Sequence, residues 1–292
     1  MSRMVCHSIT KVYGEKEVLH QVELSIESGK IYGLIGRNGA GKTTLLSIMS
    51  SQSPATSGTV TLDDAPIWEN RAALDHVCFS RELNISNESG LGNYKVRDYL
   101  RAAAAYYRNW DKQMEQNLVK LFELERKKRL GKLSKGMLSM LTIVVAMASK
   151  AEFTFLDEPV AGLDVIAREQ FYKLLLQEYT ETGRTFLIST HIIEEAADVL
   201  EEVIILNRGQ ILRKENTQEL VSRAYYVTGL ADQVDAATAG LEVHHPEVIG
   251  RSKTVTVLLQ QGQSLPSGYD VTVQPMNLQK VFVSLCGEES QL

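Results

Sequence analysis

The sequence predicts an α/β fold in which a parallel sheet lies between layers of helices. The first observation is a short apolar run at residues 31–35, followed by a glycine-rich loop and a helix-forming segment. The second is the alternation of apolar strands with helical segments from that loop to about residue 214. The apolar runs have the length and composition of buried parallel strands. We therefore expect a three-layer core.

The glycine-rich loop predicts a nucleotide-phosphate site. Residues 31–44 read IYGLIGRNGAGKTT and fit G-x-x-x-x-G-K-S/T at every required position. The glycines permit a tight turn whose backbone N–H groups face phosphate oxygens, and the following helix adds its positive end. Lys42 supplies a cation for the β- and γ-phosphates, and the Thr43 hydroxyl is a ligand for Mg²⁺. A turn without a ligand is the weaker alternative, because strand, loop, lysine, threonine and helix follow in order. The predicted nucleotide-binding residues are Gly36, Arg37, Asn38, Gly39, Ala40, Gly41, Lys42, Thr43 and Thr44.

Composition limits the remaining classes of protein. The 292 residues allow one large domain, or a domain of about 200 residues with a smaller companion. A net charge of −5 argues against a broad nucleic-acid-binding face. The 3 cysteines form neither a metal pattern nor a disulfide framework, which favours a reducing compartment. The N-terminus lacks the apolar core of a signal peptide, and no window approaches the roughly 18 apolar residues of a membrane span. We expect a protein that does not cross a bilayer by itself.

Segments before residue 130 add two structures to this core. Alternating residues at 4–26, 59–64 and 76–79 predict strands, the first range turning near Gly14 into an antiparallel pair. A helical insertion follows, with helices at 96–107 and 114–124, and the second of these has three apolar residues at helical spacing: Leu118, Leu121 and Phe122. The RKKR cluster at 126–129 resembles a nucleic-acid patch, but four charges near a helix end fit a solvated helix terminus better.

The second half of the chain returns to the core pattern. Helices and strands are expected to alternate at 133–149, 153–159, 167–179, 185–190, 192–202, 203–207 and 210–214. From about residue 222 short strands such as 254–259 and 269–273 take over, and 276–285 closes the chain as a helix that docks on a core. The domains predicted are 1–221, with a helical subdomain at about 83–135, and a small α+β domain at 222–292.

Polar side chains at the ends of two core strands carry the remaining chemistry. Asp157 and Glu158 end one apolar strand, where parallel sheets place functional groups beside their ligands. Adjacent residues point in alternate directions, so Asp157 is expected to hold Mg²⁺ and Glu158 to polarise the attacking water as a general base. His191 ends the next core strand at the same edge of the sheet, within reach of a γ-phosphate. The alternatives are a capped strand end and a satisfied surface histidine.

Together these residues resemble the ATP-binding cassette (ABC) family, over most of residues 1–215. GRNGAGKTT is similar to that family's Walker A segment and FTFLDEP to its Walker B segment, with Glu158 as the catalytic glutamate. AGLD at 161–164 resembles the D-loop, which ends at Asp164, and His191 matches the switch histidine. Tyr13 stands where an aromatic residue stacks on adenine. Glu82 falls at the Q-loop, where the resemblance implies a further contact to the metal. The family fold is that of P-loop NTPases, a RecA-like three-layer core with an antiparallel β subdomain and a helical insertion.

The resemblance also implies a second subunit. LSKGM at 133–137 stands at the LSGGQ signature, where Ser134 and Gly136 are retained but Lys135 replaces a glycine and Met137 a glutamine. In the family, two cassettes pack head to tail, and each sandwiches ATP between its Walker A loop and its partner's signature. We expect Ser134, Lys135 and Gly136 to contact ATP in trans, and Lys135 either to obstruct that approach or to add a cation. Because every hydrolytic residue is present, we expect a working site.

The function expected is ATP hydrolysis in a transporter. The resemblance implies ATP and Mg²⁺ as cofactors, a homo- or heterodimer of cassettes, and separate multi-span membrane permease subunits that contact residues 82–99. The closing segment 276–285 is similar to ATPases of ABC-2-type exporters of drugs, antimicrobial peptides or lipids, so we expect a peripheral protein on the cytoplasmic face of the membrane. A soluble ABC ATPase acting on nucleic acid or ribosomes is disfavoured, because residues 45–132 leave no room for a long coiled coil and the chain has one cassette. A low-activity regulatory cassette is the third reading.

Overall fold

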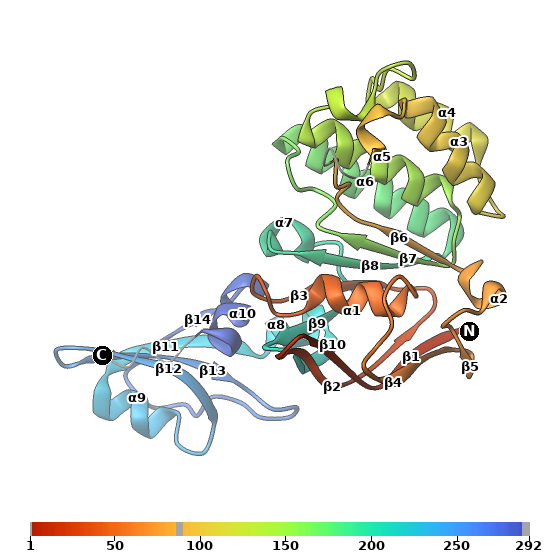
Figure 1. The fold of residues 1–292 in the computed structure, drawn as a ribbon. Coiled ribbons are helices and arrows are strands. Elements are labelled where there is room, and N and C mark those ends of the chain that lie inside the picture. The colour runs from red at the N-terminus through yellow and green to blue at the C-terminus, as the bar shows by residue number, and fades with distance from the viewer. Residues whose placement is uncertain (1, 86–89, 288–292) are drawn as a thin grey trace.

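The computed structural model describes residues 2–85 and 90–287 (Figure 1). Its centre is a sheet of six strands in the order β10-β9-β3-β8-β7-β6. In that order the strands are Gln210–Asn216, Glu202–Asn207, Ile31–Ile35, Thr185–Thr190, Phe153–Asp157 and Val77–Ser80. Five of them run parallel, and β10 pairs antiparallel with β9 through the hairpin at 208–209. The parallel α/β core predicted from the sequence is confirmed, with an antiparallel strand at one edge.

Strand β3 shows how this sheet sits between two layers. Ile31 and Ile35 face a core shared with the helices, whereas Tyr32 and Leu34 face a second core shared with helix α1 (Lys42–Met49) and an antiparallel sheet. All five residues of β3 are buried, as expected of a strand covered on both faces. The antiparallel sheet has the order β2-β1-β4-β5, from strands Lys16–Glu27, Arg3–Tyr13, Ser57–Leu62 and Ala65–Pro66.

Longer helices cover the other face of the central sheet (Figure 1). They are α3 (Val96–Tyr106), α4 (Lys112–Leu121), α5 (Lys135–Ala148) and α6 (Val165–Thr182). Short elements complete this part: helices α2 (Arg71–Leu74), α7 (Ile193–Ala197) and α8 (Thr217–Ser222), and 3₁₀ turns at Leu91–Asn93 and Leu130–Lys132. Within the described residues, no helix combines the length and apolar character needed to span a bilayer.

Two sequence predictions for the helices were wrong in detail. Leu121 was placed on the buried face of α4, but 52% of it is exposed. The buried stripe runs instead through Glu115, Leu118, Val119 and Phe122, at spacings of three and four residues that leave Leu121 outside. The helix expected at 192–202 is only the five residues of α7, because the chain turns after it and buries Leu200 against Gly33.

The C-terminal part of the chain, which we call the C-terminal module, begins at β11 and ends at α10. Its sheet has the order β12-β13-β11-β14, from strands Glu242–Ile249, Ser252–Leu258, Ala224–Leu230 and Val271–Pro275. Helix α9 (Ala231–Ala237) packs on one face of that sheet and buries Val234 against Val227 and Val255. The short strands expected after residue 222 are therefore present and form one antiparallel sheet.

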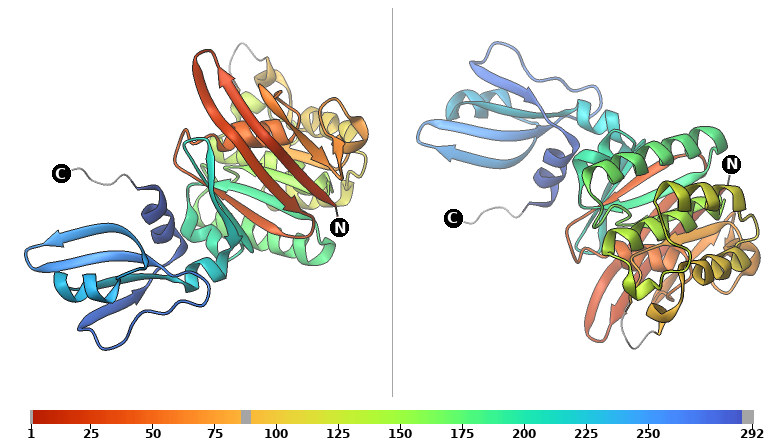
Figure 2. Two further views of the ribbon diagram at one scale, coloured as in Figure 1. Left: turned by 90° about the horizontal axis from the view of Figure 1, so that it is seen from below. Right: turned by 90° about the horizontal axis from the view of Figure 1, so that it is seen from above.

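Helix α10 (Leu278–Cys286) joins the C-terminal module to the rest of the molecule (Figure 2). Leu278 and Val281 are buried in the same core as Ile193 and Ala196 of α7. The side chain of Asn277, which caps α10, also donates to Glu194 Oε1 of α7 at 3.2 Å. The prediction of a core-docking helix at 276–285 is confirmed.

Candidate nucleotide-binding site

The phosphate loop lies between the end of β3 and the start of α1. Gly39 and Gly41 have backbone φ angles of 79° and 107°, in the left-handed region that favours glycine. At Gly36 the limit is space rather than φ, since an added Cβ would lie 2.4 Å from the carbonyl oxygen of Leu206 in β9. The loop therefore needs glycine at these three positions because of backbone conformation and space alone, whether or not a ligand is bound.

Lys42 is held inside the loop that it follows. Its side chain is 7% exposed, and Nζ donates to the carbonyl oxygen of Gly36 at 2.7 Å. Burial lowers the pKa of Lys42 from the usual 10.5, and the negative charges of Glu158 and Asp157 oppose that shift. A buried ammonium with one weakly bound carboxylate neighbour, Glu158 Oε1 at 3.9 Å, is suited to receive a phosphate oxygen.

Thr43 and Asp157 meet across the site. The Thr43 hydroxyl donates to Asp157 Oδ2 at 2.7 Å, and Ser189 on the neighbouring strand β8 donates to Asp157 Oδ1. A hydroxyl and a carboxylate are the hard oxygen ligands that Mg²⁺ prefers. No group of three or more His, Cys, Asp or Glu side chains within residues 2–85 and 90–287 is placed to hold a metal. A cation here would accordingly take its other ligands from phosphate and water.

Glu158 and His191 are in contact. His191 Nδ1 lies 2.7 Å from Glu158 Oε2, and the strand ends that carry them are neighbours because Asp157 pairs with Ser189. Glu158 adopts a left-handed φ of 51°, a conformation uncommon for residues with a side chain and found at functional sites. Its backbone N–H donates to the Ser189 carbonyl at 3.0 Å, which helps to fix that turn. The sequence prediction that Glu158 and His191 share one sheet edge is confirmed.

A pocket with a volume of about 410 Å³ opens over the phosphate loop, Asp157 and Glu158, and His191 does not line it. Its floor is the phosphate loop with Asp157 and Glu158, and its rim is the β1–β2 hairpin with Tyr13, Lys16 and Val18. Tyr13 is half exposed, and Lys11 Nζ lies 4.8 Å from the centre of its ring. An exposed aromatic ring above a phosphate-binding loop is available for stacking on a base.

The signature segment lies apart from this pocket. Ser134 caps α5 by accepting from the N–H of Met137 at 3.2 Å. Gly136 packs so closely on the D-loop that an added Cβ would lie 2.7 Å from the Gly162 carbonyl oxygen. Asp164 caps α6 by accepting from the N–H of Ala167 at 2.9 Å. None of Ser134, Lys135, Gly136 or Asp164 lines the nucleotide pocket of the described chain.

Glu82 is the predicted metal contact that the structure does not group with Thr43 and Asp157. Its carboxylate Oε1 lies 3.3 Å from Lys135 Nζ, both side chains are more than half exposed, and Glu82 does not line the pocket. The Q-loop position is thus joined to the signature of the same chain. As a metal ligand Glu82 stays a prediction.

Sequence reasoning missed three residues of this site. Ser189 orients Asp157, and its signal was a serine directly after the apolar run FLI near the end of a core strand. Lys16 and Val18 form part of the rim opposite the loop. No sequence signal identifies them, because their place in the site depends on how the β1–β2 hairpin lies over α1.

Comparison with known proteins gives the same assignment. A family model described as "ABC transporter" matches residues 19–161. The bacitracin transport ATP-binding protein BcrA of Enterococcus faecalis is 32% identical over 225 residues, which cover 74% of this chain and 70% of BcrA. This chain belongs to the ABC transporter family of ATP-binding proteins. It is an ABC ATPase, the subunit that binds and hydrolyses ATP.

Similarity to other members extends through the C-terminal module and to solved structures. The Nod factor export ATP-binding protein I of Rhizobium meliloti is 27% identical over 296 residues, covering 97% of this ABC ATPase and 87% of that relative. The dimeric bacterial ABC transporter cassette MJ0796 has a TM-score of 0.62 at 24% identity, covering 73% of this chain and 98% of the cassette. The fold of residues outside the C-terminal module is thus that of ABC cassettes, as the sequence predicted.

Proposed function

We propose that this ABC ATPase drives export through separate membrane subunits by closing on ATP with a second cassette. The observation that carries the proposal is the separation of two half-sites on one chain. The pocket holds the groups for binding and attack, whereas Ser134 and the start of α5 lie outside it. A partner's signature would complete the pocket and exclude water from it.

Within one chain, the phosphate loop would bind the triphosphate. Lys42 Nζ would exchange its bond to the Gly36 carbonyl for β- and γ-phosphate oxygens, and the N-terminus of α1 adds a positive end. Tyr13 would stack on adenine. Thr43 and Asp157, which already share a hydrogen bond, would hold Mg²⁺. The metal neutralises charge that develops on the phosphates.

Glu158 would act as the base that polarises the attacking water. Its Oε1 and Oε2 are held by different partners, Lys42 at 3.9 Å and His191 at 2.7 Å. Two partners on one carboxylate fix its orientation, which is what positioning a nucleophilic water requires. His191 Nδ1 is bonded to Glu158, and its other ring nitrogen, Nε2, would donate to a γ-phosphate oxygen when both ring nitrogens carry a proton.

The signature would act in trans. Ser134 Oγ accepts one hydrogen bond from Met137, which leaves its O–H to donate to a phosphate oxygen. The positive end of the 14-residue helix α5 begins at the next residue. Ser134 and this helix end together suit the γ-phosphate of a nucleotide bound by another copy or by a related cassette.

A groove near the Q-loop is suited to a membrane subunit. It has a volume of 330 Å³ and lies between the end of β6 and helices α3 and α5. Its wall includes aromatic side chains and one leucine, namely Phe79, Tyr99, Tyr106, Tyr107 and Leu83. Leu83 and Tyr99 of the segment 82–99, which is predicted to receive a permease, line this groove, and residues 86–89 of that segment lie outside the described chain. Docking there would place the ABC ATPase on the cytoplasmic face of the membrane.

The export direction rests on relatives and on the chain's end. BcrA carries "bacitracin transport" in its name and the Rhizobium relative carries "Nod factor export". The closing helix α10 resembles the same element of ABC-2-type exporters.

Cell fractionation with and without a co-expressed multi-span permease tests the proposal. We expect the chain to pellet with membranes only when that multi-span partner is co-expressed. Leu83→Glu in the groove should release it, whereas Leu230→Glu, at a residue that is 51% exposed in the C-terminal module, should not. Co-sedimentation with ribosomes or DNA, or membrane binding without the permease, would contradict the proposal.

A further inference from the structure

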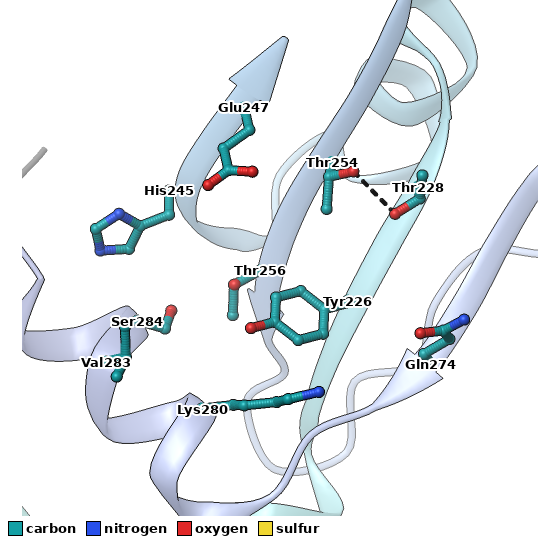
Figure 3. Close-up of a pocket in the computed structure, with 10 residues that line it drawn as sticks. All are labelled: Tyr226, Thr228, His245, Glu247, Thr254, Thr256, Gln274, Lys280, Val283 and Ser284. Carbon is teal, nitrogen blue, oxygen red and sulfur yellow. Dashed lines mark hydrogen bonds between the residues drawn. The ribbon is translucent and has the colours of Figure 1, made fainter. Parts of the chain in front are cut away.

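We propose that the C-terminal module binds a small anion bearing hydroxyl or amino groups, in a pocket between its sheet and α10. The pocket has a volume of 400 Å³, in the range of sites for small molecules. Figure 3 shows its residues, which come from all four strands and from α10. It is separate from the nucleotide pocket and shares no lining residue with it.

The sheet contributes a face of hydrogen-bonding side chains. The apolar face packs on α9, so the residues that alternate with it point the other way. Tyr226 lies opposite Thr256 and Gln274 on the neighbouring strands, and Thr228 lies opposite Thr254. The Thr228 and Thr254 hydroxyls bond to each other at 3.0 Å (Figure 3). Such a face is ordinary on a solvated sheet, and α10 makes it a pocket by covering one end.

Helix α10 contributes a buried hydroxyl, that of Ser284, which indicates a ligand. Ser284 is 6% exposed, and its Oγ has no hydrogen-bond partner among the described residues. Figure 3 shows that hydroxyl turned towards the space between His245 and Thr256. A buried hydroxyl without a partner costs free energy that a bound acceptor or donor restores.

Lys280 gives the pocket its preference for an anion. Its Nζ lies 5.3 Å from the centre of the Tyr226 ring, and no ion pair found among the described residues involves Lys280. Glu247 stands on β12 at the other side of the pocket, beside His245 (Figure 3). A molecule with an anionic group at Lys280 and a hydroxyl or ammonium group at Glu247 would satisfy both ends.

A ligand bound in this pocket would affect the nucleotide site through α10. Lys280 and Ser284 are four residues apart and face the ligand, while Leu278 and Val281 pack in the core with α7. Helix α7 begins at Ile193, two residues after His191. The inference that the bound anion changes ATP turnover rests on the proposed function, whereas the inference that the pocket binds an anion does not.

Binding is tested on the full chain saturated with ADP, which fills the phosphate loop. The probes are glucose 6-phosphate and L-glutamate at about 10 mM, with glucose as the uncharged control. If the dissociation constant is about 1 mM or lower, one of the two anions should raise Tm by about 2 °C or more. The two probes distinguish a phosphate from a carboxylate as the anionic group.

Variants test whether the rise in Tm comes from this pocket. Lys280→Gln and Ser284→Ala should each remove at least half of the shift, and Ser284→Ala should leave the stability of the free protein unchanged or higher. Lys253→Gln should keep the shift, because Lys253 pairs with Asp235 of α9, away from the pocket.

The same anion should change ATP turnover of the parent and not of Lys280→Gln. The site is refuted if neither anion shifts Tm, or if all three variants keep the shift. The link to α7 is refuted if the bound anion leaves turnover unchanged.

Discussion

Glu158, the proposed general base, is held by three constraints. Its backbone is in the left-handed region, one carboxylate oxygen contacts His191, and the other faces Lys42. A strained conformation persists only where its surroundings fix it, and here strands β7 and β8 do so. The carboxylate is consequently oriented before nucleotide arrives, as expected of preorganised catalysis.

The buried position of Lys42 predicts a pH dependence of ATP affinity. Burial lowers the pKa of the free lysine below 10.5, and bound triphosphate raises it again by placing negative charge beside Nζ. Because the complex has the higher pKa, binding takes up a proton once pH exceeds the pKa of the free lysine. Affinity should therefore fall as pH rises towards 10.5. Titration with a fluorescent ATP analogue measures it, and an affinity that stays constant up to that pH would contradict the assignment.

Lys135 is one of the two residues at which this signature departs from the family pattern, and its contacts predict a modest effect on catalysis. Its Nζ lies 3.3 Å from Glu82 of the same chain, and its side-chain stem packs on Gly162. The cation is thus engaged within its own subunit. We expect Lys135→Gly to change ATP turnover by less than tenfold, and Lys135→Ala to act as the control for loss of the charge without added backbone freedom. A rise of tenfold or more, about 1.4 kcal/mol in barrier, would show that the native signature is impaired.

At the scale of elements, a buried ionic cluster fastens α5 and α6 to the sheet. Arg184 is 5% exposed and donates to Glu178, Thr154 and three backbone carbonyls, those of Ala146, Met147 and Ala151. Glu178 is 1% exposed and also receives Lys150 at 2.8 Å. All charged atoms are paired, so the cluster stabilises the geometry only as long as it is complete.

Removing one member of this cluster should be costly. We expect Glu178→Ala to lower the free energy of unfolding by about 3–5 kcal/mol, because it leaves the buried Arg184 without its counter-charge. Glu181→Ala, on the same helix but exposed, should cost less than about 0.5 kcal/mol. Urea unfolding followed by circular dichroism measures both. A loss below about 1 kcal/mol for Glu178→Ala would mean that the pair is dispensable.

The elements that the sequence predicts well are those fixed by local pattern. The strands of the central sheet are apolar runs such as FTFLD, and the phosphate loop has obligatory residue types. Features fixed by distant contacts were not predictable. The early end of α7 depends on Leu200 meeting Gly33 of β3, and the pairing of Lys135 with Glu82 depends on how the signature lies against the Q-loop.

For the molecule as a whole, the C-terminal module has a small core of its own and also shares part of the cassette's core. Ala224, Leu258 and Met276 are buried in the same cluster as the helices over the central sheet. Helix α10 packs on α7, which follows strand β8 and His191 along the chain. Events in the module and at the nucleotide site therefore share a continuous packed path.

Because the two half-sites lie apart on one chain, we expect ATP hydrolysis to require closure of two cassettes into a dimer. The variant Glu158→Gln keeps the shape and hydrogen-bonding capacity of the side chain but removes the base. It should bind Mg-ATP, hydrolyse it at least about 100-fold more slowly than the parent, and remain closed as a dimer.

Size-exclusion chromatography with light scattering, run on Glu158→Gln with Mg-ATP and with Mg-ADP, tests this most directly. The control variant is Lys173→Gln, at a residue whose side chain is 73% exposed. We predict that Glu158→Gln is a dimer with Mg-ATP and a monomer with Mg-ADP, while Lys173→Gln hydrolyses its ATP and shows no lasting dimer. Normal hydrolysis by Glu158→Gln, or a monomer in saturating Mg-ATP, would contradict the account.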